Sequence, residues 1–129
     1  MVIDTSALIA ILLNEPETEA FVAAISAAPS RMISAVSALE TAIVIEAKKG
    51  AMGSRLFDEL LTAAQINIVA FDQTQFNLAR EAYTRFGKGR HPAALNFGDC
   101  CGYALARNTG EALLFKGQDF SATDIRPVK

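Results

Sequence analysis

Four acidic residues of this chain could do chemistry together if the fold brings their carboxylates to one place. Asp4 follows the short apolar run Met-Val-Ile, and Glu40 lies shortly after a second apolar run at 31–34. Asp99 opens the segment DCCGYALA, and Asp119 follows the apolar run ALLFK. All four acids therefore follow expected strands or stand at expected helix starts, which favours a shared site.

Each acid also has an ordinary structural explanation. Asp4 and Asp99 have the position of a helix cap, and Asp119 has that of a turn aspartate. Ser37 and Glu40 have the Ser-x-x-Glu spacing of a capping box. A capping role and a role in a site are compatible for all of them.

Carboxylates that converge repel one another and resist ionisation unless a cation lies between them. Oxygen ligands from acids, hydroxyls and water suit Mg²⁺ or Mn²⁺, and no Cys or His spacing in the chain indicates zinc. Such a cation lowers the pKa of a bound water and offsets the charge of a phosphate, as phosphodiester hydrolysis requires. Ser6, close behind Asp4, could hold water or phosphate, or could simply cap a helix.

Short apolar strands alternate with helical stretches along the whole chain. We expect strands at 2–3, 31–34, 66–71 and 112–116. We expect helices at 6–29 with a break at 14–16, then at 37–50, 54–65, 73–87 and 99–110. This alternation is typical of an α/β protein in which helices cover both faces of a mostly parallel sheet. Ligands of such sheets bind beyond the carboxyl ends of the strands, where the acids are expected.

The composition favours one compact domain spanning residues 1–129. The chain is 51% hydrophobic and 20% charged, and its net charge of −2 gives no basic footprint for nucleic acid. Cys100 and Cys101 are adjacent, which argues against a disulfide between them and favours a reducing, cytoplasmic compartment. The apolar runs are too short to cross a bilayer, so we expect no membrane association.

Four segments of the chain resemble the PIN-domain ribonucleases, and most closely the VapC-type toxins of bacterial toxin–antitoxin pairs. They are MVIDTSAL, SALE, FGKGRHPAALNFGDCCGYALA and LLFKGQDF, in this order. The resemblance implies the three-layer α/β/α PIN fold with a short-stranded sheet. It also implies an Mg²⁺-dependent endoribonuclease that acts on transfer or ribosomal RNA, forms a homodimer and is neutralised by a cognate antitoxin protein.

By position, the resemblance assigns catalytic roles to Asp4, Glu40, Asp99 and Asp119, and it implies that Asp4 and Asp99 are direct metal ligands. Ser6 matches the hydroxyl that the family has near its first acid. The chain departs from the family two residues before Asp119, where many PIN domains carry a further acid and this sequence has glycine.

Basic residues near the acids could supply the local positive charge that the net charge lacks. Lys88 and Arg90 lie in the glycine-rich loop before Asp99, and Lys116 precedes Asp119. Local cations of this kind bind an RNA backbone by neutralising phosphates. The alternative for the loop is a solvated surface segment.

Two other classes of protein fit parts of the pattern. A receiver-like signalling domain has the same fold class and an acidic Mg²⁺ pocket, with Asp72 and Lys116 cast as its aspartate and lysine, but it leaves Glu40 and Asp99 unused. A catalytically silent binding module would use the acids only as caps. The runs ALIAILL and ETAIVIEA carry more apolar surface than one helix face needs, which favours an oligomer interface in either case.

Overall fold

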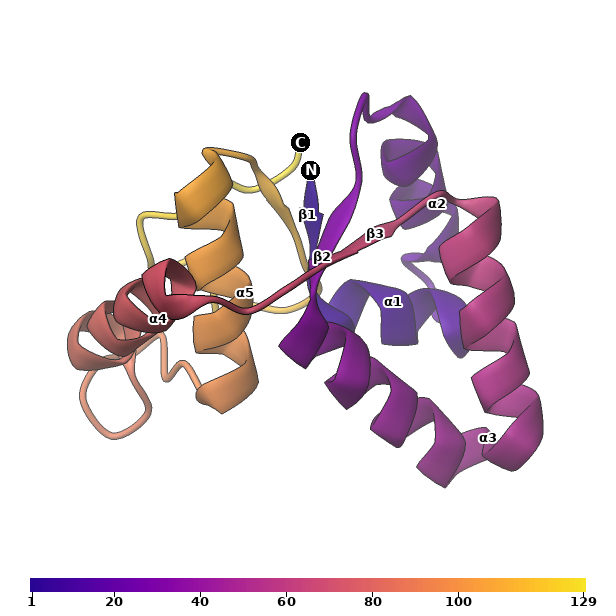
Figure 1. Ribbon diagram of the computed structural model, residues 1–129, viewed down its shortest axis with the longest axis horizontal. Helices are drawn as coiled ribbons and strands as arrows, with labels where there is room; N and C mark the ends of the chain where they lie inside the picture. The colour runs from indigo at the N-terminus through magenta and orange to yellow at the C-terminus, as the bar shows by residue number, and fades with distance from the viewer.

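The centre of the protein is a parallel sheet of four short strands (Figure 1). The computed structural model describes all residues from 1 to 129. The strands are β1 (Val2–Ile3), β2 (Met32–Ser34), β3 (Asn67–Val69) and β4 (Leu113–Leu114), in the spatial order β3-β2-β1-β4. Because every neighbouring pair is parallel, all carboxyl ends open at one edge, and β1 is an inner strand.

Five helices complete the three-layer α/β/α fold that the sequence predicts. They are α1 (Thr5–Leu12), α2 (Thr18–Ala27), α3 (Ala35–Ala63), α4 (Gln73–Phe86) and α5 (Phe97–Thr109). Figure 1 shows α4 and α5 on one side of the sheet and α1, α2 and α3 on the other. None of these helices is long and apolar enough to cross a membrane.

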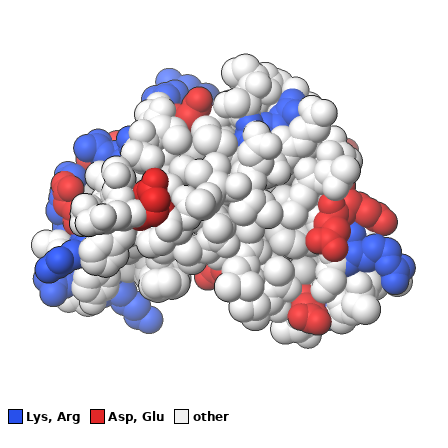
Figure 2. Space-filling view, in the orientation of Figure 1, with Lys and Arg blue, Asp and Glu red and all other residues white.

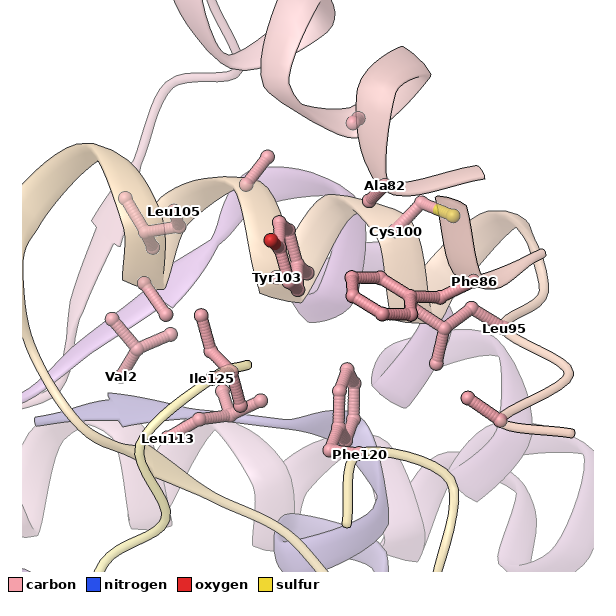
Figure 3. Packing of buried hydrophobic residues seen from close by; sticks show 14 residues of the cluster. Val2, Ala82, Phe86, Leu95, Cys100, Tyr103, Leu105, Leu113, Phe120 and Ile125 are labelled. Atoms are coloured by element: carbon pink, nitrogen blue, oxygen red, sulfur yellow. The ribbon is translucent and has the colours of Figure 1, made fainter. Parts of the chain in front are cut away.

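Successive residues of β1 and of β4 belong to two separate hydrophobic cores. Val2 and Leu113 belong to the core under α4 and α5, whereas Ile3 and Leu114 belong to the core under α1 and α3. This is the alternation expected of strands buried on both faces. Figure 3 shows the first core, in which Tyr103 from α5 lies among residues of β1, β4 and the C-terminal tail.

Helix α3 differs from the sequence-based prediction at its start and in its middle. Its N-cap is Ser34, whose Oγ accepts a hydrogen bond from the Val36 backbone N at 3.2 Å. The predicted capping box of Ser37 and Glu40 is therefore wrong, because Ser37 already lies inside the first helical turn. The two helices predicted at 37–50 and 54–65 run together as one helix with a kink at Gly50, whose positive φ of 61° suits glycine.

Helix α5 begins earlier than the prediction at Asp99. Asn96 is its N-cap: Asn96 Oδ1 accepts from the Asp99 backbone N at 2.9 Å, and Asp99 Oδ2 accepts from the Asn96 backbone N at 3.1 Å. This reciprocal capping box fixes the Asp99 side chain at the third helical position. At α4 the N-cap is Asp72, whose Oδ1 accepts from the Gln75 backbone N at 2.9 Å.

The apolar run ALIAILL on α1 does not expose the excess apolar surface that its sequence predicted. Ala7, Leu8 and Ala10 are buried in the core under α1 and α3, and the remaining apolar residues of the run pack against it. In the other run, ETAIVIEA on α3, Ile43 is 58% exposed. The exposed apolar surface therefore belongs to α3 rather than to α1.

Candidate active site

Asp4 stands at the carboxyl end of the inner strand β1 and is 5% exposed. It is the N-cap of α1, and its Oδ2 accepts hydrogen bonds from the Ser6 backbone N at 3.0 Å and from Ser6 Oγ at 2.6 Å. Ser6 Oγ in turn accepts from the Lys116 backbone N at 2.9 Å, which ties Asp4 to the segment after β4. One carboxylate oxygen of Asp4 is thus fixed by the chain, and capping is compatible with a role for the other oxygen.

Two glycines on α5 make room for the acidic side chains. A Cβ atom at Gly98 would lie 2.6 Å from Glu40 Oε1, and a Cβ at Gly102 would lie 3.3 Å from Asp4 Oδ1. Glycine within a helix costs about 0.5–1 kcal/mol relative to alanine, so two of them in one helix need a compensating role. That role is the close approach of α5 to Glu40 on α3 and to Asp4.

The electrostatics show that the four predicted acids lie around one site. The pKa of Asp99 is raised to about 7, chiefly by burial and in smaller part by the nearby charges of Asp4, Asp119 and Glu40. Burial also raises the pKa of Asp4, and Glu40 and Asp119 add to that effect. Asp119 itself is exposed at the rim, in the segment after β4.

The acids approach one another without enclosing a metal. No group of three or more Asp, Glu, His or Cys side chains is close enough to hold an ion by itself. The donor set nevertheless fits a hard divalent cation, because it consists of oxygens with an uncompensated negative charge and Asp4 Oδ1 accepts no hydrogen bond from the protein. In such a site Asp4 and Asp99 would be the ligands, and water would fill the other coordination positions.

The predicted cationic residues lie in different surroundings. Lys116 Nζ is paired with Glu15 at 3.0 Å and with Glu17 at 3.3 Å, so its charge is already partly neutralised. In the loop before α5, Lys88 is exposed and the Arg90 guanidinium lies 5.2 Å from the centre of the Tyr83 ring. Figure 2 shows Lys and Arg gathered on the side of α4 and the following loop, while the middle of that face is nearly free of charge.

Sequence reasoning missed the residues that shape the site rather than carry its charge. These are the two glycines and the cap Asn96. A signal for the glycines was present, because Gly98 and Gly102 are spaced by one helical turn around Asp99 in a segment that otherwise favours helix.

The fold and the sequence can be compared with known proteins. The PIN domain family model matches residues 1–126. A "VapC ribonuclease Mb0640" of Mycobacterium bovis is 52% identical over 128 residues, which cover 99% of this chain and 98% of that protein. A "Ribonuclease VapC" of Mycolicibacterium smegmatis is also 52% identical, with 99% of both chains covered.

Solved structures agree on the fold. Mycobacterium tuberculosis VapC20, described as a sarcin–ricin loop cleaving toxin, matches with a TM-score of 0.75 at 19% identity, over 98% of both chains. A toxin–antitoxin complex from Klebsiella pneumoniae matches with a TM-score of 0.71 at 17% identity, over 95% of this chain and 92% of that one. These findings exclude the receiver-like alternative, and Asp72 acts as the cap of α4. The chain belongs to the PIN-domain family and, within it, to the VapC ribonucleases.

Proposed function

We propose that this protein is an Mg²⁺-dependent endoribonuclease toxin that hydrolyses phosphodiester bonds of transfer or ribosomal RNA and is neutralised by a cognate antitoxin. The observation that carries the metal requirement is the raised pKa of both Asp4 and Asp99 within one site. Carboxylates that the fold itself makes costly to ionise are stabilised when a divalent cation binds between them. Mn²⁺ would satisfy the same oxygen ligands.

The residues divide the work of hydrolysis between them. Asp4 and Asp99 would hold the cation, which supplies an activated water and offsets the charge of the phosphate. Ser6 keeps Asp4 in position through the two hydrogen bonds to Oδ2. Glu40, which lies next to Gly98, would orient the attacking water and accept its proton, and Asp119 would add a carboxylate at the rim.

The RNA class and the protein partners rest on the relatives. VapC20 is described as cleaving the sarcin–ricin loop, which supports a structured RNA loop as the substrate of this chain too. Exposed Lys88 and Arg90 are the candidates for contacts with its phosphates, with Lys116 and Ser6 at the other side of the site. The toxin–antitoxin complex from Klebsiella pneumoniae supports an antitoxin partner.

A homodimer is the oligomer that the surface of α3 favours. Leu39 and Ile43 lie one turn apart on this helix and are 62% and 58% exposed. A second copy of the chain that packs against this face would remove the two side chains from water.

The test measures cleavage of transfer and ribosomal RNA by the purified chain, with Mg²⁺ and with EDTA. We expect cleavage with Mg²⁺, none with EDTA, and at least a ~100-fold lower rate for Asp4→Asn and Asp99→Asn, because each removes a charged ligand. Asp58→Asn is the matched control, since Asp58 is an exposed aspartate in the second half of α3. Cleavage that persists in EDTA or in both site variants would contradict the proposal, and a chain inactive on every RNA would favour the silent binding module.

A further inference from the structure

Ser37 is a buried side chain that neither the fold nor the proposed mechanism uses. It is 1% exposed, and its Oγ has no hydrogen-bond partner in the protein. The capping role that its sequence position suggested belongs to Ser34. A buried hydroxyl without a partner is destabilising, so a hydrogen-bond partner from outside the chain, such as a water molecule, would stabilise this position.

The backbone carbonyl of Ser37 is fixed by hydrogen bonds, whereas its hydroxyl group has no hydrogen-bond partner. The Ser37 carbonyl oxygen accepts hydrogen bonds from Thr5 Oγ1 at 3.0 Å and from Thr41 Oγ1 at 2.8 Å. These bonds come from the start of α1 and from the next turn of α3. They fix the place of the Ser37 side chain between the two helices.

The free hydroxyl and the free oxygen of Asp4 both lie next to Gly102. A Cβ atom at Gly102 would lie 3.3 Å from Asp4 Oδ1 and 4.0 Å from Ser37 Oγ. A larger residue at position 102 would come into tight contact with Asp4 Oδ1, so glycine allows α5 to lie next to both oxygens. Ser37 also precedes Glu40 by one turn of α3, so both side chains emerge on the face turned toward α5.

We infer that Ser37 is a positioning residue of the cation site: its Oγ holds a water molecule beside Asp4 Oδ1, and this water is a ligand of the divalent cation. The inference rests on the proposed function, which places the cation at Asp4. The two oxygens of Asp4 would then have different roles. Ser6 donates both of its hydrogen bonds to Oδ2, and Oδ1 stays available for the cation on the side of Ser37.

The chemistry of Mg²⁺ supports a role of this kind. The ion loses its water shell reluctantly and is usually bound by few carboxylates with several waters retained. No three acids enclose an ion here, so retained waters must make up the rest of the shell. Groups that orient such ligands typically account for about 10- to 100-fold in metal affinity or activity.

The test compares Ser37→Ala with Ser34→Ala, a second buried serine three residues earlier in the chain. Mn²⁺ affinity is measured from the electron paramagnetic resonance signal of free Mn²⁺, kcat and KM are measured on the cleaved RNA, and Tm is measured without metal. For Ser37→Ala we expect about 10-fold weaker Mn²⁺ binding, a lower kcat at unchanged KM, and no loss of Tm. For Ser34→Ala we expect a lower Tm from the lost cap, with Mn²⁺ affinity and kcat unchanged.

The outcomes separate this inference from the proposed function. If Ser37→Ala binds Mn²⁺ and turns over RNA as the unsubstituted chain does, the Ser37 inference is overturned while the metal-dependent nuclease stands. A Tm loss in Ser37→Ala with unchanged Mn²⁺ affinity also overturns it, because the hydroxyl would then be purely structural. An unsubstituted chain that neither binds Mn²⁺ nor cleaves RNA overturns both.

Discussion

Removing the charge of Asp99 should stabilise the protein when no metal is bound. The pKa of this carboxyl is raised from 3.8 to about 7, chiefly by burial and further by the acids around it. When folding raises the pKa of a carboxyl group, ionising that group in the folded protein costs free energy. This cost grows as the pH rises from the pKa of the unfolded state to the pKa of the folded state. Without metal, the ionised Asp99 therefore lowers the folding stability by its full amount above about pH 7 and by almost nothing near pH 4.

The size of the effect follows from the shift and from the exposure of the group. A shift of about 3 units corresponds to roughly 4 kcal/mol if no solvent screens the charge. Asp99 is only partly buried, and solvent screens part of its charge, so we expect the ionised group to destabilise the fold by about 1–2 kcal/mol. Asparagine keeps an oxygen for the capping bond from Asn96 but loses the favourable charge at the helix N-terminus, about 0.3–1 kcal/mol.

Asp99→Asn should therefore gain about 1 kcal/mol at about pH 8, or about 4 °C in Tm for a chain of this length. Thermal unfolding is measured with EDTA near pH 8 and near pH 4, and again with Mg²⁺. We expect the gain near pH 8 without metal, little gain near pH 4, and a smaller Mg²⁺-induced rise in Tm than in the unsubstituted chain.

The control and the refuting result are both specific. Asp58→Asn also removes one negative charge, but from an exposed position on α3, and should change the stability by no more than about 0.5 kcal/mol at either pH. A metal-free Asp99→Asn protein that is less stable than the unsubstituted chain near pH 8 would refute the reasoning. An equal gain near pH 4 and pH 8 would refute it too, because the effect would then not come from ionisation.

Three further predictions address the shape of the site, the C-terminal tail and the surface of α3. Gly98→Ala should displace the Glu40 carboxylate and lower the cleavage rate at saturating RNA by about 10-fold while Tm stays equal or rises, and a lower Tm with normal cleavage would contradict this. Tyr103→Phe removes a 2.7 Å hydrogen bond to Asp124 and should lower the free energy of unfolding in urea by about 1–2 kcal/mol without changing cleavage. Leu39→Asp should convert a dimer into a monomer in size-exclusion chromatography with light scattering, and an unchanged mass would argue against the α3 interface.

The sequence predicted the fold well because its signals were local. The alternation of short apolar runs with helical stretches reflects burial on both faces of the strands, and the two separate cores show that burial directly. Asp72 could be identified as a cap because the residues that make that bond are three positions apart. The helix boundaries were harder to predict. Ser34 and Ser37 are both suitable N-caps for α3, and the choice between them depends on where β2 ends.

The charges of the site were predictable, but its shape was not. Asp4 and Asp99 are visible in the sequence as acids in apolar surroundings. The contacts that place them connect residues distant along the chain, such as Gly102 with Asp4 and Gly98 with Glu40. A single sequence does not show which helix faces contact each other. The role of the two glycines therefore becomes visible only in the folded structure, where α5 packs against α3 and Asp4.

The charge distribution gives the cation a second task beyond chemistry. The chain is negative overall, its carboxylates lie at the edge of the proposed active site, and Lys116 on that edge is already paired with Glu15 and Glu17. Without a cation, this edge would repel an RNA backbone, since like charges meet there at short range in a partly buried site. Lys88 and Arg90, exposed in the loop before α5, would contact neighbouring phosphates if the proposed substrate binds there. We therefore expect the divalent cation to be needed for RNA binding at this edge as well as for its cleavage, so that the metal and the substrate bind cooperatively.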